Sequence, residues 1–245
     1  MFVVAHISDL HCNGTRFNRS RIEATLSYIN ARADGLGALL VTGDITDEGS
    51  ESEYREAYDV LESPLPMIIT AGNHDERRNF NRGLLQRDTD EPVNHAVVID
   101  GVLFLVVDSS IPGRNDGYID NDTLAWMVTE IESADPTTRV IIAFHHPPVT
   151  LQMTFMDTIR QNGEDRLASL VDRHPNIVGF VCGHAHTPAV TTFAGRPLAV
   201  APGVASTLNL PFEGEEIVNR GQPPGIAFHM LDGDRLITHF RSVMV

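Results

Sequence analysis

The sequence contains no lysine, because all 18 of its basic residues are arginine. Schiff-base catalysis and P-loop phosphate binding both require a lysine, so both are excluded. Basic charge is also scarce overall: 33 acidic residues outnumber the arginines and give a formal net charge of −15. Nucleic-acid polymers and anionic membranes are normally bound through a basic surface. The charge therefore argues against both as partners.

Cysteine and long apolar runs are scarce as well. The two cysteines, Cys12 and Cys182, are too few for a disulfide framework, which suits a reducing compartment. No apolar run approaches the roughly 18 residues that a membrane span needs. The N-terminus has no basic region, apolar stretch or cleavage site of the kind that marks a signal peptide. We therefore expect a cytoplasmic protein that does not enter a membrane.

The chain of 245 residues, 42% of them hydrophobic, is long enough to bury a substantial core. No linker, repeat or low-complexity segment interrupts it, so we expect a single domain over residues 1–245. Two segments, 147–163 and 202–225, have no regular period and contain many Pro, Gly and Met residues. They are candidates for a lid, a dimer contact or a substrate-facing loop.

Short apolar runs alternate with amphipathic stretches along the chain. This alternation predicts strands at 2–7, 38–42, 67–71, 97–99, 102–107, 140–144, 177–182, 190–193, 198–201, 226–231 and 236–240, and helices at 20–32, 51–61, 77–86, 121–133 and 164–173. The first half alternates strand and helix, and the last third consists mostly of antiparallel strands. The pattern is typical of an α/β protein with one mixed sheet, or with two packed sheets flanked by helices.

A polar cluster follows nearly every predicted strand. The carboxyl ends of strands in an α/β sheet form the crevice where ligands bind, so we expect these clusters to meet in the fold. The 11 histidines and the many acids are donor types that divalent metals prefer. The donors at strand ends are Asp9, His11, Asp44, Asn73, His145, His184 and His186. These are too many for one tetrahedral ion, and they suit two ions about 3.5–4 Å apart that share one carboxylate.

Each motif has an ordinary interpretation when it is taken alone. Asp9-x-His11 is common by chance, and the Gly-Asn-His-Asp run at 72–75 is also typical of a turn. His146 is expected to point away from His145 at a strand end, and either to be structural or to support a ligand without binding a metal itself. Other histidines without a polar companion are interpreted as surface or satisfied core residues: His6, His95, His174, His229 and His239. The ordered conjunction of the motifs favours a metal site over chance.

The motifs together resemble those of the calcineurin-like metallophosphoesterases. They are, in order, Asp9-x-His11, Gly43-Asp44-x-x-Asp47, Gly72-Asn73-His74-Asp75, His145-x-Pro147 and Gly183-His184-x-His186. Within that family, the chain is similar to the class III cyclic nucleotide phosphodiesterases and to the bacterial glycerophosphodiesterases. The resemblance implies an α/β fold, a four-layer αββα sandwich of two mixed β-sheets flanked by helices.

The resemblance also implies a role for each matching residue. Asp9, His11 and His186 hold one metal ion, Asn73, His145 and His184 hold the other, and Asp44 bridges the two. His74 is then the catalytic histidine and not a ligand, and Asp47 or Asp75 orients it. The two divalent ions are manganese, iron, zinc or cobalt, because mixed oxygen and nitrogen donors suit all four.

The activity implied is hydrolysis of a small phosphodiester by a hydroxide that bridges the two divalent ions. Cyclic nucleotides such as 3′,5′-cAMP and glycerophosphodiesters are the expected small-molecule substrates, and we expect a homo-oligomer, a dimer or higher. A phosphomonoesterase on the same scaffold, including a protein phosphatase, is the main alternative. The net charge disfavours a nuclease. The presence of every metal donor disfavours a catalytically inactive scaffold protein.

Overall fold

The first of two large β-sheets is built from both ends of the chain. The computed structural model describes residues 2–245, apart from the side chain of Phe2. The strand order is β15-β14-β1-β2-β3. The bounds are Arg235–Ser242 for β15, Gly225–Asp232 for β14, Phe2–Ile7 for β1, Ala38–Thr42 for β2 and Met67–Thr70 for β3. The strands β1, β2 and β3 are parallel, whereas β14 is antiparallel to both of its neighbours.

The second large sheet takes its strands from the middle of the chain. Its order is β10-β11-β9-β7-β5-β4. The bounds are Ala189–Phe193 for β10, Arg196–Val200 for β11, Ile177–Cys182 for β9, Arg139–Ala143 for β7, Val102–Val106 for β5 and His95–Ile99 for β4. The four inner strands are parallel, and β10 and β4 pair antiparallel at the two edges.

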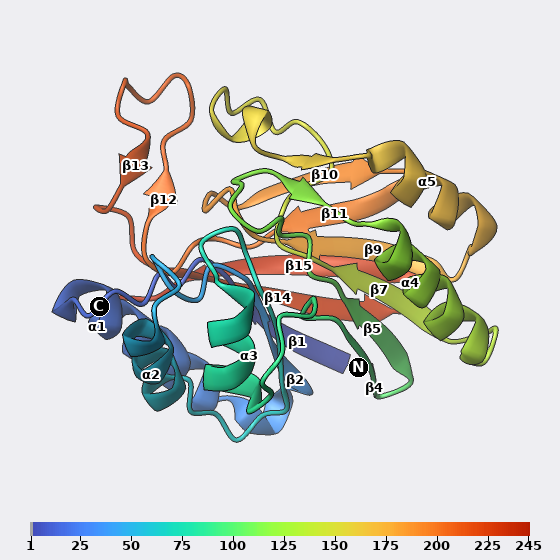
Figure 1. The fold of residues 1–245 in the computed structure, drawn as a ribbon, viewed down its shortest axis with the longest axis horizontal. Coiled ribbons are helices and arrows are strands. Elements are labelled where there is room, and N and C mark those ends of the chain that lie inside the picture. The colour runs from blue at the N-terminus through green and yellow to red at the C-terminus, as the bar shows by residue number, and fades with distance from the viewer. Residues whose placement is uncertain (1) are drawn as a thin grey trace.

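The helices cover the outer faces of the sheets and complete four layers (Figure 1). The helices α1 (Arg16–Asn30), α2 (Glu51–Val60) and α3 (Arg77–Leu85) pack on the first sheet. The helices α4 (Asn121–Ser133) and α5 (Glu164–Arg173) pack on the second. A third apolar cluster fills the space between the sheets and includes Val4, Leu40, Phe104 and Ile141. The αββα sandwich implied by the sequence is therefore confirmed.

Strand alternation explains how one sheet serves two cores. In β1, Val4 belongs to the cluster between the sheets, whereas its neighbours Ala5 and Ile7 belong to the cluster beneath the helices. Successive side chains of a strand point to opposite faces, so an apolar strand with both faces covered buries every residue. The strands appear as uninterrupted apolar runs in the sequence because both of their faces are buried.

Short elements occupy the two segments that were expected to be loops. Residues 147–163 contain the 3₁₀-helix η2 (Met156–Thr158) and the strand β8 (Gln161–Asn162), which pairs with β6 (Gly117–Tyr118). Residues 202–225 contain a small antiparallel hairpin of β12 (Thr207–Leu208) and β13 (Val218–Asn219), which projects from the body in Figure 1. A further 3₁₀-helix, η1, spans Ala33–Gly35.

Most predicted elements lie within two residues of the observed ones, and the first helix is the exception. It begins at Arg16 and not at Ser20, because the Thr15 hydroxyl caps it by accepting a hydrogen bond from the Asn18 backbone N–H. The polar first turn gave no apolar periodicity from which to predict it. Within residues 2–245, every helix is too short or too polar to cross a bilayer.

Candidate metal centre

The candidate ligands lie in loops that follow the carboxyl ends of five strands. The first sheet supplies Asp9, His11, Asp44 and Asn73 after β1, β2 and β3, and the second supplies His145, His184 and His186 after β7 and β9. Direct contacts join the two sets of loops. The backbone N–H of His184 donates to Asp9 Oδ2 at 3.2 Å, and the Nδ1–H of His145 donates to the Thr42 carbonyl at 2.7 Å. The structure thus brings together residues that are far apart in sequence.

Four of the candidate ligands form one buried cluster, Asp9, His11, Asp44 and His186. The Nε2 atoms of His11 and His186 lie 3.3 Å apart. Asp9 Oδ1 is 3.4 Å from His186 Nε2, and Asp44 Oδ2 is 3.7 Å from His11 Nε2. Metal–ligand bonds are about 2.0–2.2 Å long, so atoms at these separations can share one ion.

A second cluster adjoins the first, on the side of Asp44 that faces β7 and β9. His145 Nε2 lies 3.2 Å from His184 Nδ1 and 3.3 Å from Asp44 Oδ2. The same Asp44 oxygen therefore approaches a histidine of each cluster. This is the position that a carboxylate shared by two ions must take.

Two buried oxygen atoms test whether the centre fits metal ions. Asp9 Oδ1 and Asn73 Oδ1 are inaccessible to solvent and have no hydrogen-bond partner. Buried polar atoms are almost always paired, because an unpaired one costs about 1–3 kcal/mol. Both atoms belong to the residues that the sequence proposed as ligands. The donor set therefore fits two cations that share Asp44.

The outer nitrogen of each candidate histidine ligand is held by a hydrogen bond. His11 Nδ1 donates to the Asp47 carboxylate at 2.9 Å, and His186 Nδ1 donates to the Ser206 carbonyl at 3.1 Å. His184 Nε2 donates to the Ile159 carbonyl at 3.1 Å. Such bonds fix the tautomer and the ring orientation of a histidine ligand. They leave Nε2 of His11, His145 and His186, and Nδ1 of His184, facing the clusters.

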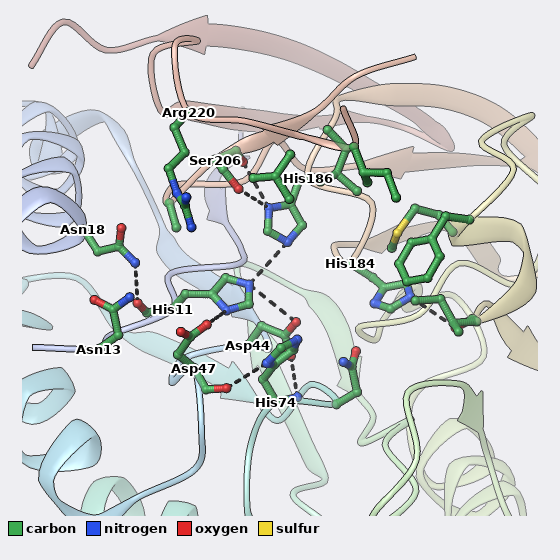
Figure 2. Close-up of a pocket in the computed structure, with 18 residues that line it drawn as sticks. His11, Asn13, Asn18, Asp44, Asp47, His74, His184, His186, Ser206 and Arg220 are labelled. Carbon is green, nitrogen blue, oxygen red and sulfur yellow. Dashed lines mark hydrogen bonds and ion pairs between the residues drawn. The ribbon is translucent and has the colours of Figure 1, made fainter. Parts of the chain in front are cut away.

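His74 lies at the centre but is exposed to the pocket above it (Figure 2). Its backbone N–H donates to Asp44 Oδ1 at 2.9 Å, and its ring Nδ1 donates to the carbonyl of Asp47 at 2.8 Å. The Asp47 carboxylate itself is bonded to His11. The main-chain carbonyl of Asp47 thus orients the ring of His74, and the side-chain carboxylate of Asp47 orients the ring of His11.

Asp75 holds the loops of the centre in place and does not orient the His74 ring. Its carboxylate accepts hydrogen bonds from the backbone N–H groups of Ile45, Thr46 and Gly72 and from the Tyr54 hydroxyl. These bonds tie the loop after β2 to the loop after β3, and so fix Asp44 relative to Asn73. Sequence reasoning alone did not separate this role from that of Asp47.

The backbone is strained at most of the candidate ligands. Among residues 2–245, five of the nine non-glycine residues with positive φ are candidate ligands: Asp9 (56°), His11 (45°), Asp44 (48°), His184 (68°) and His186 (54°). Left-handed backbone is unfavourable for L-residues by about 1–2 kcal/mol each, and it clusters at functional sites. Gly72 lies against the Asp44 carboxylate, where any side chain would collide with Asp44 Oδ1.

Electrostatics at the centre match this arrangement. Burial alone would lower the pKa of His145, but the Asp44 carboxylate, together with Asp9 and the Thr42 carbonyl, outweighs burial and raises that pKa to about 9. Burial opposes ionisation of Asp44, but the adjacent His145 holds the pKa of Asp44 well below its usual value. Without a metal, a proton on His145 therefore balances the buried carboxylate.

His146 lies closer to the centre than the sequence suggested. Its ring packs 4.8 Å from that of His145 and 4.5 Å from that of His184, and it does not point away from them. The strand β7 ends at Ala143, so strand alternation does not extend to these histidines. Burial lowers the pKa of His146 to about 3, with His145 adding to the effect, so the ring is neutral. The Ser109 hydroxyl lies 2.8 Å from its Nδ1.

A pocket of about 250 Å³ opens above both clusters. Residues of the segment 147–163 form one wall, namely Phe155, Met156 and Ile159. Residues of the segment 202–225 form another, namely Ala205, Ser206, Leu208, Ile217, Val218 and Arg220. Sequence reasoning marked both segments as substrate-facing candidates, but it singled out neither Ser206 nor Arg220, because no motif surrounds them.

A four-layer sandwich with two adjoining Asp/His clusters at its strand ends is the arrangement of a metal-dependent phosphoesterase. Residues 2–188 match the family described as calcineurin-like phosphoesterase, and the chain belongs to that family.

Several bacterial phosphodiesterases are similar to the chain. It is 33% identical over 223 residues to a probable cyclic nucleotide phosphodiesterase of Rhodococcus erythropolis, across 86% of this chain and 73% of that protein. It is 29% identical over 255 residues to the glycerophosphodiester phosphodiesterase GpdQ of Enterobacter lignolyticus, across 98% of this chain and 91% of that protein. A dimetal phosphatase from Danio rerio has the same fold, with a TM-score of 0.72 at 15% identity, across 98% and 96% of the two chains.

Metal affinity is expected to rise with pH up to about 9. The pKa of His145 is raised to about 9, so its ring is protonated at pH 7 and must lose the proton before an ion binds. Affinity should increase roughly tenfold per pH unit for each proton released. Calorimetric titration with Mn²⁺ between pH 6.5 and 9, in buffers of different ionisation enthalpy, counts the protons. Affinity that is independent of pH, without proton release, contradicts the assignment.

Replacing Asp44 by Asn is expected to weaken binding of both ions at once. In the metal-free variant, only Asp9 and the Thr42 carbonyl are left to oppose the burial of His145, so its pKa should fall from about 9. Metal content after dialysis and NMR titration of the imidazole protons measure the two effects. Asp59→Asn, at an exposed position on α2, is the matched control. Retention of one ion at wild-type affinity is the contrary result.

Proposed function

We propose that the chain is a binuclear-metal phosphodiesterase that hydrolyses small phosphodiesters. In this proposal Asp9, His11 and His186 hold one divalent ion, Asn73, His145 and His184 hold the other, and Asp44 is shared. The observation that carries the proposal is the position of Asp44 Oδ2, within 3.7 Å of His11 Nε2 and 3.3 Å of His145 Nε2. Manganese, iron, zinc and cobalt all suit these donors.

When bound, two divalent ions supply Lewis-acid charge and lower the pKa of a coordinated water. The chain itself orients the ligands through Asp47, Thr42, Ile159 and Ser206, as described above. His74 donates through Nδ1 to the Asp47 carbonyl, which leaves its Nε2 free on the pocket side. In the imidazolium form of the ring, which carries a proton on each nitrogen, Nε2 can deliver a proton to the departing alkoxide or donate to a phosphoryl oxygen. His74 is therefore proposed as the catalytic histidine.

Three observations favour a small diester as the substrate. The Rhodococcus and Enterobacter relatives are named for cyclic nucleotide and glycerophosphodiester substrates respectively. The pocket is small and has both apolar and polar walls, which suits an organic substituent on the phosphate. The net charge of −15 disfavours a nucleic-acid polymer.

The organisation of the chain is part of the proposal. We place the whole activity in a single domain, 1–245, with the segments 147–163 and 202–225 as substrate-facing walls because their residues line the pocket. A cytoplasmic location and a homo-oligomer stay predictions from the sequence.

The substrate class is tested by a panel assayed with Mn²⁺. The panel contains 3′,5′- and 2′,3′-cyclic nucleotides, glycerophosphodiesters, and matched bis- and mono-aryl phosphates. We expect diesters to be hydrolysed with higher kcat/KM than the matching monoesters, and Asn73→Ala to be inactive because it loses a ligand. Preference for the monoester throughout the panel would replace the proposal with a phosphomonoesterase.

Replacing His74 by Ala is expected to leave metal binding intact and to lower kcat by about 10²–10⁴-fold, as for loss of an acid–base group. If His74 protonates the leaving alkoxide, the loss should be smaller for an aryl ester, whose phenolate leaves without a proton, than for an alkyl ester. Comparing the two esters with metal-loaded variant and wild type measures this. Loss of metal in the variant, or an equal kcat, contradicts the role.

A further inference from the structure

Arg220 follows the strand β13 at the base of the β12–β13 hairpin. In this hairpin Thr207 pairs with Asn219, so the register places Arg220 across from Ser206. Ser206 in turn contacts the ligand His186, whose Nδ1 lies 3.1 Å from both the carbonyl and the hydroxyl of Ser206. The hairpin therefore positions Arg220 directly beside the metal centre.

A second arginine, Arg21 on α1, fixes the base of that hairpin. Its buried guanidinium donates to the carbonyl of Val204 at 2.7 Å and to that of Gln222 at 2.8 Å. These carbonyls lie on the two chain segments that enter and leave the hairpin. Thr187 adds a further link, because its hydroxyl accepts from the Leu208 N–H at 3.1 Å. The position of Arg220 is thus set by side chains from outside the hairpin.

The Arg220 guanidinium has no counter-charge of its own. Within residues 2–245 it forms no hydrogen bond and no ion pair, although the chain contains 33 acidic residues. Figure 2 shows it pointing into the pocket, between Asn18 and His186 and above His11. It is the only arginine that lines this pocket. The unpaired charge faces the space that a substrate has to enter.

We propose that Arg220 binds the phosphate oxygens of the anionic ester, and that Arg21 is a positioning residue that acts through it. The first part rests on the proposed function, since it assumes a phosphate ester in this pocket. A planar guanidinium matches two phosphate oxygens at once and keeps its charge at any physiological pH. Arg220 is exposed and lies on a hairpin outside the ligand loops, so it contributes to substrate capture and not to the chemical step.

The specific expectation is a change in KM with little change in kcat. With bis(p-nitrophenyl) phosphate and Mn²⁺, Arg220→Gln should raise KM about tenfold, the effect of losing one charge-assisted hydrogen bond, and change kcat by less than about twofold. The KM of Arg220→Lys should lie between that of Arg220→Gln and that of the wild type. The matched control is Arg55→Gln, an exposed arginine on α2 that is remote from the pocket. An unchanged KM in Arg220→Gln overturns the proposal.

Binding of inorganic phosphate separates this proposal from the proposed function. Calorimetry on the Mn²⁺-loaded protein should show about tenfold weaker phosphate binding in Arg220→Gln than in wild type or Arg55→Gln. If wild type hydrolyses no phosphate ester but this difference is found, the proposed function fails and the role of Arg220 stands. If wild type is active and phosphate affinity is unchanged, the role of Arg220 fails alone.

The role of Arg21 is tested by coupling. Arg21→Met should raise KM and weaken phosphate binding in the wild-type background, and should add nothing in the Arg220→Gln background, because its effect is already lost. Arg21→Lys, which keeps the charge but cannot bridge both carbonyls, serves where the Met variant folds poorly, as judged by its Tm. Additive effects in the double variant, or no effect in the single variant, would overturn the positioning role.

Discussion

The contacts of the Asp44 carboxylate, which lies between the two clusters, are the interactions on which the rest of the centre depends. Asp44 and Asp9 are almost fully buried, at 2% and 0% exposure. A buried carboxylate requires a matching positive charge or a set of hydrogen bonds, because its desolvation otherwise costs several kcal/mol. One Asp44 oxygen lies between histidines of both clusters, and the other accepts from the backbone of His74. Asp44 therefore links both proposed ion sites to His74, the proposed catalytic histidine.

The two sheets bring the histidines and carboxylates together only through loops with a strained backbone. Five candidate ligands have left-handed backbone, at about 1–2 kcal/mol each, against a total stability of about 5–15 kcal/mol for a typical domain. The bonds of Asp75, the Thr42 carbonyl beneath His145 and the Ser206 carbonyl beneath His186 hold these loops in place. Binding of ions that prefer the folded chain adds to its stability by mass action. The hydrogen bonds that keep the backbone of these loops strained thus also hold the candidate ligands rigid.

Sequence reasoning predicted what depends on local pattern and missed what depends on packing. The strand 38–42 and the helix 164–173 were placed to the residue, because burial on both faces and a strong amphipathic period mark them. The Asp, Asn and His donors follow strands, so their convergence followed from topology. The ring of His146 was misplaced because β7 ends before it. The distinct bonds of Asp47 and Asp75, and the place of Arg220 beside Ser206, arise from contacts between distant segments that no local pattern records.

Diffraction from crystals of the manganese-loaded protein tests the central claim most directly. Anomalous scattering at the manganese edge should show two peaks about 3.5–4 Å apart, with the Asp44 carboxylate in contact with both. Asp9, His11 and His186 should surround one peak, and Asn73, His145 and His184 the other. A single peak in fully loaded crystals, or two peaks of which only one contacts Asp44, would contradict the account.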